Sequence, residues 1–301
     1  MEADVNRPNM VAVITKQVRA YQWVKNLLLF VPIALAHRLT DTDALIACVL
    51  GFIAFSFTAS AVYIVNDIVD RDHDRQHPRK RHRPIAAGHI SVGAASGIAA
   101  VLVASALVIT LTTLPSSFAL WLAFYAVVTS LYSFVLKRLV LVDVIALAGL
   151  YSLRIAAGGA ASDVPVSTWL LGFSLFLFMS LAFLKRYTEL LDTIERDGRV
   201  VSGRGYHAGD ANFVLVAGTA LGFVAVLVFT LYVNAPQVQT LYTRPHLMWL
   251  VAPCLVYWIS HLWLSAHRGA MHDDPIVFAV RDGMSWAVGI AITSIVVAAS
   301  L

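Results

Sequence analysis

The sequence predicts an all-α membrane protein, a bundle of nine transmembrane helices whose cytoplasmic loops form the mouth of an active site. Three observations predict this fold class. Hydrophobic residues make up 59% of the chain and charged residues only 13%, whereas a soluble domain carries about 25% charged residues. Apolar runs long enough to span a membrane recur along the chain. Lys and Arg residues gather in alternate connections between these runs.

Nine apolar runs are candidates for spanning helices, because about 20 apolar residues cross a bilayer. They cover residues 24–37, 44–65, 93–114, 117–136, 139–161, 167–184, 212–233, 246–265 and 284–300. The first run is short, and basic residues precede it as in a secretion signal. We nevertheless expect it to be retained as the first helix. Cys48 and Cys254 lie in separate runs and predict neither a disulfide nor a zinc site.

The basic residues predict how the chain threads the membrane, since cytoplasmic loops are enriched in Lys and Arg. A cytoplasmic N-terminus and nine spans place 19 of the 22 Lys and Arg residues inside. Arg38 and Arg244 then lie outside, and Arg154 lies within a span. The net charge of +4 reflects a basic cytoplasmic face and predicts no nucleic-acid binding. The long loops on that face are residues 66–92, 185–211 and 266–283.

The first long loop begins with polar and acidic residues at helical spacing. If the second helix continues through them, one face carries Asn66, Asp67, Asp70 and Asp74. Neighbouring carboxylates on a helix repel one another, so we expect a cation to offset them. Oxygen ligands of this kind suit Mg²⁺, which is usually held by one or two carboxylates, waters and substrate phosphates. The spacing therefore predicts a magnesium site.

Basic residues follow these acids closely. Arginine forks suit bidentate phosphate contacts, and we expect Lys80, Arg81 and Arg83 to bind phosphate. Acids for a metal ion and bases for phosphates together predict a diphosphate site. Two other interpretations stay open. One is a solvated loop whose acids pair with neighbouring bases, and the other is a transition-metal site at His73 and His77.

A second charged segment, residues 185–192, follows the sixth apolar run. Helical spacing puts Lys185, Glu189 and Asp192 on one face, while Arg186 points elsewhere. We interpret this face as a second wall of the same site, with a cation for the leaving group and carboxylates for a second ion. The alternative is a helix end that carries ordinary ion pairs.

Arg154 stands out because a charge within a span is costly and by default marks a functional or paired position. Its partner is either Asp143 or a substrate phosphate, and both stay open. Lys25 and Asn26 lie at the cytoplasmic edge of the first run, where we expect them to contact substrate. The third loop adds His272, Asp273, Asp274, Arg281 and Asp282.

The first charged segment also matches a known family, because it reads NDIVDRDHD at residues 66–74 and continues closely with RPIAAG. This pattern resembles the first motif of the UbiA superfamily of intramembrane prenyltransferases. The resemblance covers essentially the whole chain. It implies a nine-helix bundle in which two cytoplasmic motifs hold Mg²⁺ and a diphosphate. The first motif would be Asn66, Asp67, Asp70 and Asp74, and the second would be Lys185, Arg186, Tyr187 and Glu189.

The second motif departs from the aspartate pair of the aromatic prenyltransferases. The chain looks more like the decaprenyl-phosphate phosphoribosyltransferase branch, on the segments QWVKN, HPRKRHRPIAAG, KRYTEL and DDPIVFAVRD. Because QWVKN belongs to the pattern, the resemblance implies that the first helix is retained, as we expect. This resemblance implies catalytic roles for Lys185, Tyr187 and Glu189 beside the three aspartates, and substrate binding by Arg186.

The implied reaction moves 5-phosphoribose from phosphoribosyl diphosphate to a polyprenyl phosphate, with Mg²⁺ as cofactor, to supply arabinose donors for the cell envelope. We expect one domain over residues 1–301 in the bacterial cytoplasmic membrane, surrounded by membrane lipids. Self-association is left open. One alternative is an aromatic prenyltransferase that uses a polyprenyl diphosphate and an aromatic acid. Another is a transporter of an anionic lipid.

Overall fold

The computed structural model describes residues 9–76, 80–195, 205–271 and 274–301. In this part of the chain the secondary structure is helical and no strand occurs, which confirms the all-α prediction. The chain divides into two compact units. Unit 1 comprises residues 1–133 and 153–166, and unit 2 comprises residues 134–152 and 167–301. The organisation as one domain stays a prediction.

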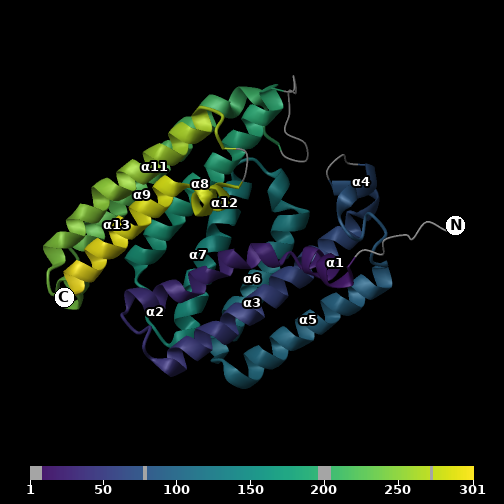
Figure 1. Cartoon of the computed structure of the whole chain (residues 1–301), viewed down its shortest axis with the longest axis horizontal. Helices are drawn as coiled ribbons and strands as arrows, with labels where there is room; N and C mark the ends of the chain where they lie inside the picture. The colour runs from purple at the N-terminus through teal and green to yellow at the C-terminus, as the bar shows by residue number, and fades with distance from the viewer. Residues whose placement is uncertain (1–8, 77–79, 196–204, 272–273) are drawn as a thin grey trace. The chain divides into compact units, whose positions relative to one another are not determined.

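Unit 1 is built mainly on a long helix, α3 (Thr42–Val69), with α5 (Val92–Thr113) packed along it (Figure 1). Side-chain caps fix where these two helices begin, because Asp41 accepts from the Ala44 amide and Ser91 accepts from the Ala94 amide. The remaining elements are α1 (Met10–Gln17), η1 (Ala20–Phe30), α2 (Val31–Leu35), α4 (Arg71–Gln76), η2 (Lys80–His82), α6 (Ser116–Phe134) and the second half of α7 (Val142–Ser162).

Unit 2 contains the first half of α7 and a group of helices in which α8 (Thr168–Glu195) and α9 (Ala211–Val233) lie side by side (Figure 1). A Cβ atom on Gly218 of α9 would lie 2.3 Å from the Trp263 ring, so only glycine permits this close approach to α11 (Val251–His267). The remaining elements are η3 (Leu136–Arg138), η4 (Ala208–Asp210), α10 (Pro236–Leu241), η5 (Pro245–Leu250), α12 (Pro275–Arg281) and α13 (Gly283–Ser300).

Within the described residues, eight helices are long and apolar enough to cross a membrane, and the chain is a multi-pass membrane protein. The expected count of nine is approximate. The run predicted at residues 24–37 corresponds to a shorter apolar segment, Ala20–Leu35, which is divided between the 3₁₀ helix η1 and the short α2. Pro32 stands at the start of α2, where a residue without an amide hydrogen is tolerated.

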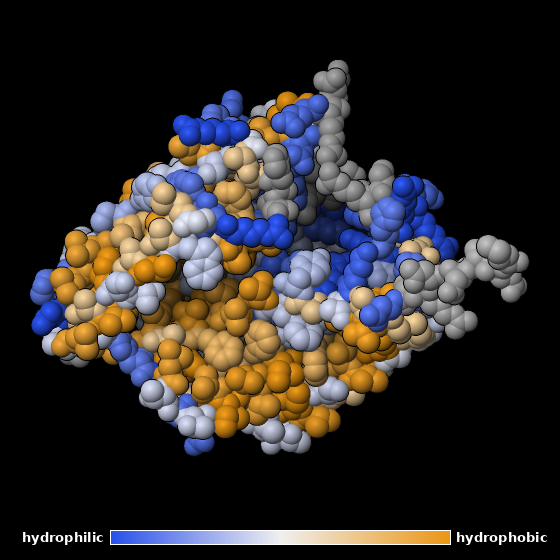
Figure 2. Space-filling view, in the orientation of Figure 1, coloured by the Kyte–Doolittle hydropathy of each residue, from blue (hydrophilic) through white to orange (hydrophobic). Residues whose placement is uncertain are grey.

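Two predicted boundaries differ in ways that matter for the site. The helix predicted over residues 167–184 continues to Glu195, so the second charged segment lies on a helix and not in a loop. Helix α3 ends at Val69, and Asp70 separates it from α4. The first motif is therefore divided between two helices. In unit 1, hydrophilic residues gather over α4, whereas the surface over α3 and α5 is largely apolar (Figure 2).

Candidate functional site

The first cluster of charged groups lies in unit 1 around Asp67, in the last turn of α3. The Asp67 side chain is only 3% exposed. It accepts from Arg19 Nη2 over 2.6 Å, from Arg83 Nη1 over 3.0 Å and from Gln17 Nε2 over 3.1 Å. A buried carboxylate is costly unless it is paired and hydrogen-bonded. The three donors therefore hold Asp67 as the centre of a prearranged polar cluster.

Asp74, from α4, joins this cluster through Arg83. The same Arg83 Nη1 atom donates to Asp67 Oδ1 over 3.0 Å and to Asp74 Oδ2 over 2.7 Å. Asp74 is buried as well. One cationic nitrogen thus occupies a position that two carboxylates share. The break between α3 and α4 at Asp70, with φ −85° and ψ 3°, still leaves both carboxylates within reach of that nitrogen.

Asn66 precedes Asp67 in α3 and contributes an amide oxygen. Its Nδ2 donates to Ser133 Oγ over 2.9 Å. Its Oδ1 is buried, and in the described part of the chain no donor reaches it. A buried acceptor without a donor is uncommon in native proteins and calls for an explanation. A cation bound beside Asp67 would be one.

The donor set fits Mg²⁺ by its chemistry. The described residues contain no group of three or more His, Cys, Asp or Glu side chains that could hold a metal ion. Two carboxylates and the Asn66 amide oxygen are nevertheless hard oxygen ligands, and Mg²⁺ usually completes its six positions with waters and substrate phosphates. The shared position of Arg83 Nη1 indicates where the two carboxylates meet a positive charge.

Arg19 and Gln17 belong to this cluster, although the sequence did not single them out. Arg19 adopts a left-handed backbone with φ 53°, between α1 and η1, and non-glycine residues rarely adopt that conformation. Its guanidinium lies 4.7 Å from the centroid of the Tyr63 ring. Such a backbone costs about 1–3 kcal/mol and persists only where the surrounding structure holds it. No sequence signal predicts this conformation at an arginine.

The other predicted phosphate contacts in unit 1 lie nearer the solvent. Lys80 and Arg81 in η2 are exposed, and Lys25 is half-buried. The Lys16 side chain donates to the His82 carbonyl oxygen over 3.0 Å, which ties α1 to the basic segment. The predicted residues His77, His272 and Asp273 lie outside the described residues.

Arg154 is buried in unit 1, where it contacts Asn26 and Tyr125. Its Nε donates to Asn26 Oδ1 over 2.8 Å and its Nη2 to the Tyr125 hydroxyl over 3.1 Å. The guanidinium also lies 4.8 Å from the Tyr125 ring centroid. The predicted pairing with Asp143 is wrong, because eleven residues along one helix separate the two by about 16 Å. Asn26 also donates to Ser56 over 3.0 Å.

The second cluster lies in unit 2 along the end of α8. Lys185 Nζ and Asp274 Oδ2 form an ion pair at 2.7 Å. The Tyr187 hydroxyl and His267 Nδ1 are hydrogen-bonded at 3.0 Å, and Tyr187 is buried. Glu189 pairs with Arg186, so Lys185, Tyr187 and Glu189 of the predicted second motif each make a specific polar contact.

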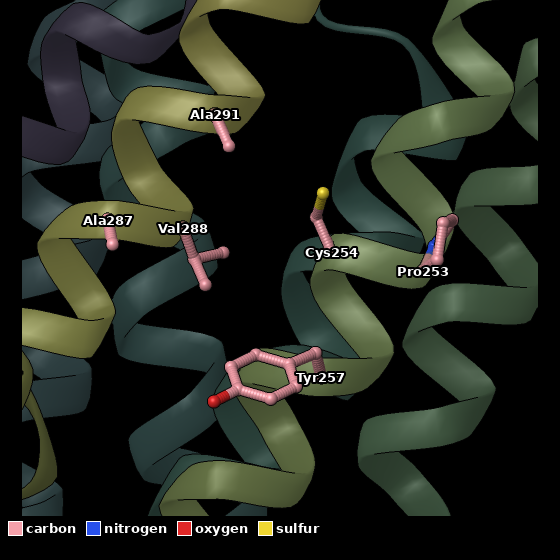
Figure 3. Close-up of a pocket in the computed structure, with 6 residues that line it drawn as sticks. All are labelled: Pro253, Cys254, Tyr257, Ala287, Val288 and Ala291. Atoms are coloured by element: carbon pink, nitrogen blue, oxygen red, sulfur yellow. The ribbon is translucent and has the colours of Figure 1, made fainter.

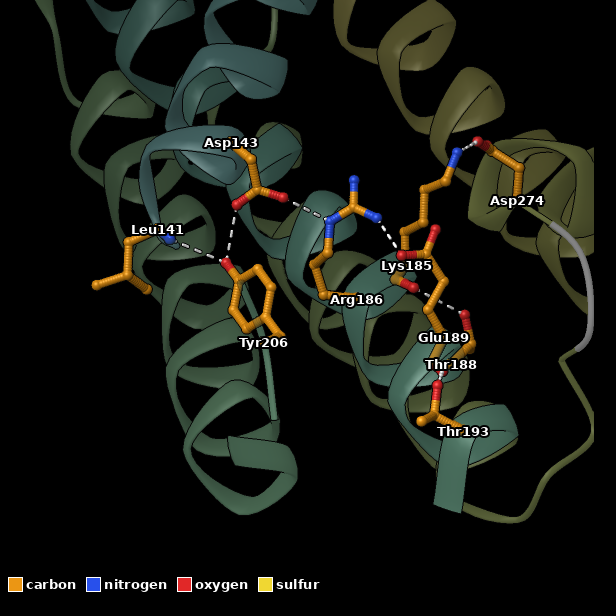
Figure 4. A network of polar contacts seen from close by, with 9 residues as sticks. All are labelled: Leu141, Asp143, Lys185, Arg186, Thr188, Glu189, Thr193, Tyr206 and Asp274. Carbon is orange, nitrogen blue, oxygen red and sulfur yellow. Dashed lines mark hydrogen bonds and ion pairs between the residues drawn. The ribbon is translucent and has the colours of Figure 1, made fainter. Parts of the chain in front are cut away.

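Arg186 lies inside unit 2 at 1% exposure, in ion pairs with Asp143 and Glu189 (Figure 4). Its Nε lies 2.8 Å from Asp143 Oδ2. The expectation that Arg186 points away from the face of Glu189 is wrong, since residues three apart on a helix are neighbours and these two are paired. Asp143 also accepts from the Tyr206 hydroxyl over 2.8 Å. The sequence did not mark Tyr206.

Unit 2 also has an apolar groove between α11 and α13, with a volume of about 360 Å³ (Figure 3). Its lining residues are Pro253, Cys254, Tyr257, Ala287, Val288 and Ala291. None of these side chains carries a charge at neutral pH. The groove therefore offers contacts to hydrocarbon and none to a charged side chain among its lining residues.

Comparison with known proteins places these features in a family. The profile of the UbiA prenyltransferase family matches residues 27–278. Uncharacterized protein y4nM of Sinorhizobium fredii is 39% identical over 280 residues, 92% of this chain and 54% of that protein. Nodulation protein NoeC of Azorhizobium caulinodans is 37% identical over 272 residues, 89% of this chain and 86% of that protein. This chain thus spans about half the length of the Sinorhizobium protein.

An enzyme and a solved structure extend the comparison. The decaprenyl-phosphate phosphoribosyltransferase of Mycobacterium tuberculosis is 37% identical over 197 residues, 64% of this chain and 65% of its own length. A UbiA homolog from Archaeoglobus fulgidus, solved with GPP and Mg²⁺ bound, superposes with a TM-score of 0.68 at 17% identity. That alignment covers 94% of this chain and 99% of the other. At this identity the likeness shows the fold alone.

Proposed function

Because this chain belongs to the UbiA prenyltransferase family and is a membrane transferase, we propose that it transfers 5-phosphoribose from phosphoribosyl diphosphate to a polyprenyl phosphate. The bond between ribose C1 and the diphosphate oxygen breaks. A bond forms between C1 and an oxygen of the lipid phosphate, and diphosphate leaves with the bonding electron pair. The 37% identity with the mycobacterial decaprenyl-phosphate phosphoribosyltransferase supports this choice of donor and acceptor.

The observation that carries the proposal is the placement of Asp67 between two arginines, Arg19 and Arg83. Carboxylates alone suit a cation, and arginines alone suit an anion. A site that keeps both in contact suits a metal complex of an anion, in which carboxylates bind the metal and guanidinium groups bind the phosphates. Phosphoribosyl diphosphate is such an anion. It also carries a 5-phosphate, which further basic residues can bind.

The residues that would hold Mg²⁺ are Asn66, Asp67, Asp70 and Asp74. When bound, Mg²⁺ neutralises charge that develops on the departing diphosphate. A cation held by Asp67 and Asp74 would take over the role that Arg83 Nη1 plays in the structure. The Arg83 and Arg19 guanidinium groups would then bind phosphate oxygens. Lys80 and Arg81, which are exposed, would bind the 5-phosphate.

The remaining predicted residues are proposed to serve the same reaction. Lys25, Asn26 and Arg154 would bind substrate, with Arg154 held in place by Asn26 and Tyr125. In unit 2, Lys185 would stabilise negative charge on the leaving group, and Tyr187 and Glu189 would orient bound groups. Arg186 is buried, so its contribution would pass through Glu189. The lipid phosphate is already anionic at neutral pH, so the reaction depends on positioning and electrostatic stabilisation.

The proposed setting is the bacterial cytoplasmic membrane, with the N-terminus and both charged clusters on the cytoplasmic side. The excess of Lys and Arg in the predicted inner loops supports this orientation. A charged, water-soluble donor would then reach the site from the cytoplasm. The polyprenyl acceptor would reach it from the membrane, and the product would supply arabinose donors for the cell envelope.

Aromatic prenyl transfer is the second candidate, because other UbiA enzymes remove diphosphate from an allylic lipid. The carbocation that forms needs aromatic faces for stabilisation. In unit 1 the Tyr125 ring is already covered by the Arg154 guanidinium, and a second cation beside it would be repelled. This contact favours an anionic substrate group near Tyr125.

The test is a transfer assay on the detergent-solubilised protein with Mg²⁺, radiolabelled phosphoribosyl diphosphate and a polyprenyl phosphate. We expect label to move into the organic phase. Asp67→Asn should abolish transfer, whereas Asp72→Asn should preserve it, because Asp72 is exposed and contacts only neighbouring arginines among the pairs described. Transfer from a polyprenyl diphosphate to an aromatic acid, with no phosphoribosyl transfer, would replace the proposal with the second candidate. Movement of a polyprenyl phosphate across the proteoliposome membrane, with the lipid chemically unchanged, would indicate a transporter.

A further inference from the structure

A buried relay of polar groups in unit 2 ends at a predicted site residue. Asp143, at the start of α7, is 0% exposed, and Arg186 is 1% exposed. The Asp143 carboxylate contacts Arg186 Nε through one oxygen at 2.8 Å and the Tyr206 hydroxyl through the other at 2.8 Å. Figure 4 shows these side chains pointing toward one another from three separate segments. Both carboxylate oxygens are therefore used inside the unit.

Two hydrogen bonds fix the position of the Tyr206 hydroxyl. It donates to Asp143 and accepts from the Leu141 amide over 3.0 Å. The preceding residue, Gly205, packs closely against Val140, since a Cβ atom on Gly205 would lie 2.7 Å from Val140 Cγ2. A tyrosine hydroxyl is protonated at neutral pH, and burial raises the pKa of Tyr206 further above its ordinary value. Tyr206 therefore acts as a fixed hydrogen-bond donor.

Arg186 links the buried Asp143 to Glu189, which lies nearer the surface of the unit. While Nε contacts Asp143, Nη1 donates to Glu189. The Glu189 side chain is 30% exposed, so it is the member of the relay that solvent and solutes can reach. One planar guanidinium thus forms ion pairs with Asp143 and Glu189 at once. A lysine in the same place has a single ammonium group and cannot reproduce this geometry.

We propose that Tyr206 and Asp143 are positioning residues, which hold Arg186 so that Glu189 presents its carboxylate in one fixed orientation for the transfer reaction. This inference rests on the proposed function, because it assigns Glu189 a role in that reaction. The energetic reason is general. At metal sites, removing a hydrogen-bond partner that orients a ligating side chain typically lowers metal affinity or activity by about 10- to 100-fold, and we expect an effect of this order here. The relay then serves turnover, and the stability of the unit is a separate property.

The test is a double-mutant cycle between Tyr206→Phe and Glu189→Gln, with kcat and KM measured for each variant. Tyr206→Phe keeps the ring and removes only the hydroxyl. We expect kcat to fall about tenfold with little change in KM. If Tyr206 acts through Glu189, the same substitution in the Glu189→Gln protein should lower kcat by less than about twofold. Arg186→Lys should fail to preserve activity.

A matched control separates positioning from stability. Tyr242→Phe removes a hydroxyl from another buried tyrosine of unit 2, outside the relay, and should leave kcat unchanged. Losses from Tyr206→Phe and Glu189→Gln that multiply, as independent effects do, would overturn the inference. A normal kcat in Tyr206→Phe would also overturn it.

The failure of this inference can be told apart from the failure of the proposed function. If the wild type transfers a prenyl group and no phosphoribosyl group, the proposed donor is wrong, and the same cycle is measured on prenyl transfer. If neither reaction is found, the cycle is measured on the rise in unfolding temperature caused by Mg²⁺ and inorganic diphosphate. Coupling between the two substitutions then supports the relay, and independent effects overturn it.

Discussion

Arg19 donates to the Asp67 carboxylate over 2.6 Å, although the two residues are 48 positions apart in the chain. The contact joins the segment between α1 and η1 to the last turn of α3. It neutralises a carboxylate that burial would otherwise make costly. The first motif is thus stabilised by arginines of the same unit, and a phosphorylated substrate would find both charges already in place.

Loss of the Arg19 guanidinium should weaken binding of the anionic donor. We expect Arg19→Gln to raise KM for phosphoribosyl diphosphate about tenfold or more, because a charge-assisted contact is worth about 1.5–3 kcal/mol. Steady-state kinetics at fixed Mg²⁺ measure this. Arg71→Gln is the control, since Arg71 pairs only at the surface with Asp72 among the contacts described. Equal effects from both substitutions would show that Arg19 acts through general charge alone.

Asp67 should also contribute to stability before any ligand binds. Asp67→Asn leaves Arg19 and Arg83 facing a neutral amide. We expect the free energy of unfolding to fall by about 1–3 kcal/mol, which is less than for a fully buried ion pair because both arginines are partly exposed. Unfolding of the detergent-solubilised protein by added denaturant measures the change. Asp72→Asn, at an exposed pair, should change stability by less than about 0.5 kcal/mol. An unchanged Asp67→Asn protein would contradict the structural role.

Two glycines of α7 should respond differently to the same substitution. A Cβ atom on Gly158 would lie 2.0 Å from the Leu29 carbonyl oxygen, whereas none of the atoms described lies within 4 Å of such an atom on Gly149. We expect Gly158→Ala to destabilise unit 1 by more than about 2 kcal/mol, because backbone must move. Gly149→Ala should be neutral or stabilising by up to about 1 kcal/mol. Thermal unfolding compares the pair, and similar midpoints would argue against this packing.

The buried Arg154 should not tolerate replacement by lysine. Its guanidinium reaches Asn26 and Tyr125 together, and an ammonium group cannot match that fork. We expect Arg154→Lys to cost about 1–3 kcal/mol of stability, since a buried partner loses its hydrogen bond. Tyr125→Phe removes only one of the two contacts and should cost less. A lysine variant as stable as the wild type would show that charge, and not geometry, matters at this position.

Asp282 should make stability depend on pH in the acid range. Although partial burial works in the other direction, hydrogen bonds from Ser285 and contact with His261 lower the pKa of Asp282 below its ordinary 3.8. A lowered pKa contributes stability that is complete above 3.8 and is lost as the pH falls through the lower folded value. Unfolding temperatures from about pH 6 to about pH 3 measure this. Asp282→Asn should flatten the acid side of the curve, and Ser285→Ala should flatten it partly. An unchanged slope in Asp282→Asn would assign the acid sensitivity elsewhere.

The sequence by itself determined the fold class, the family and the position of most spans. Hydropathy is a local property, so the apolar runs match helices such as α5 and α9 within a few residues. Hydropathy predicted the end of a helix less well where the last turns are polar. The sixth run reads as ending at residue 184, yet α8 continues to Glu195, because backbone hydrogen bonds continue after the hydrophobic residues stop.

Only the tertiary structure decided which charges meet. Asp67 and Asp74 are visible in the sequence as a motif, but Arg19, which pairs with Asp67, adopts a left-handed backbone that nothing in its local sequence predicts. Asp143 pairs with Arg186 and Tyr206 and not with Arg154. Ion pairs between distant segments depend on how helices pack and which carboxylates they bury. The sequence therefore supplied the chemical groups, and packing decided which of them act together.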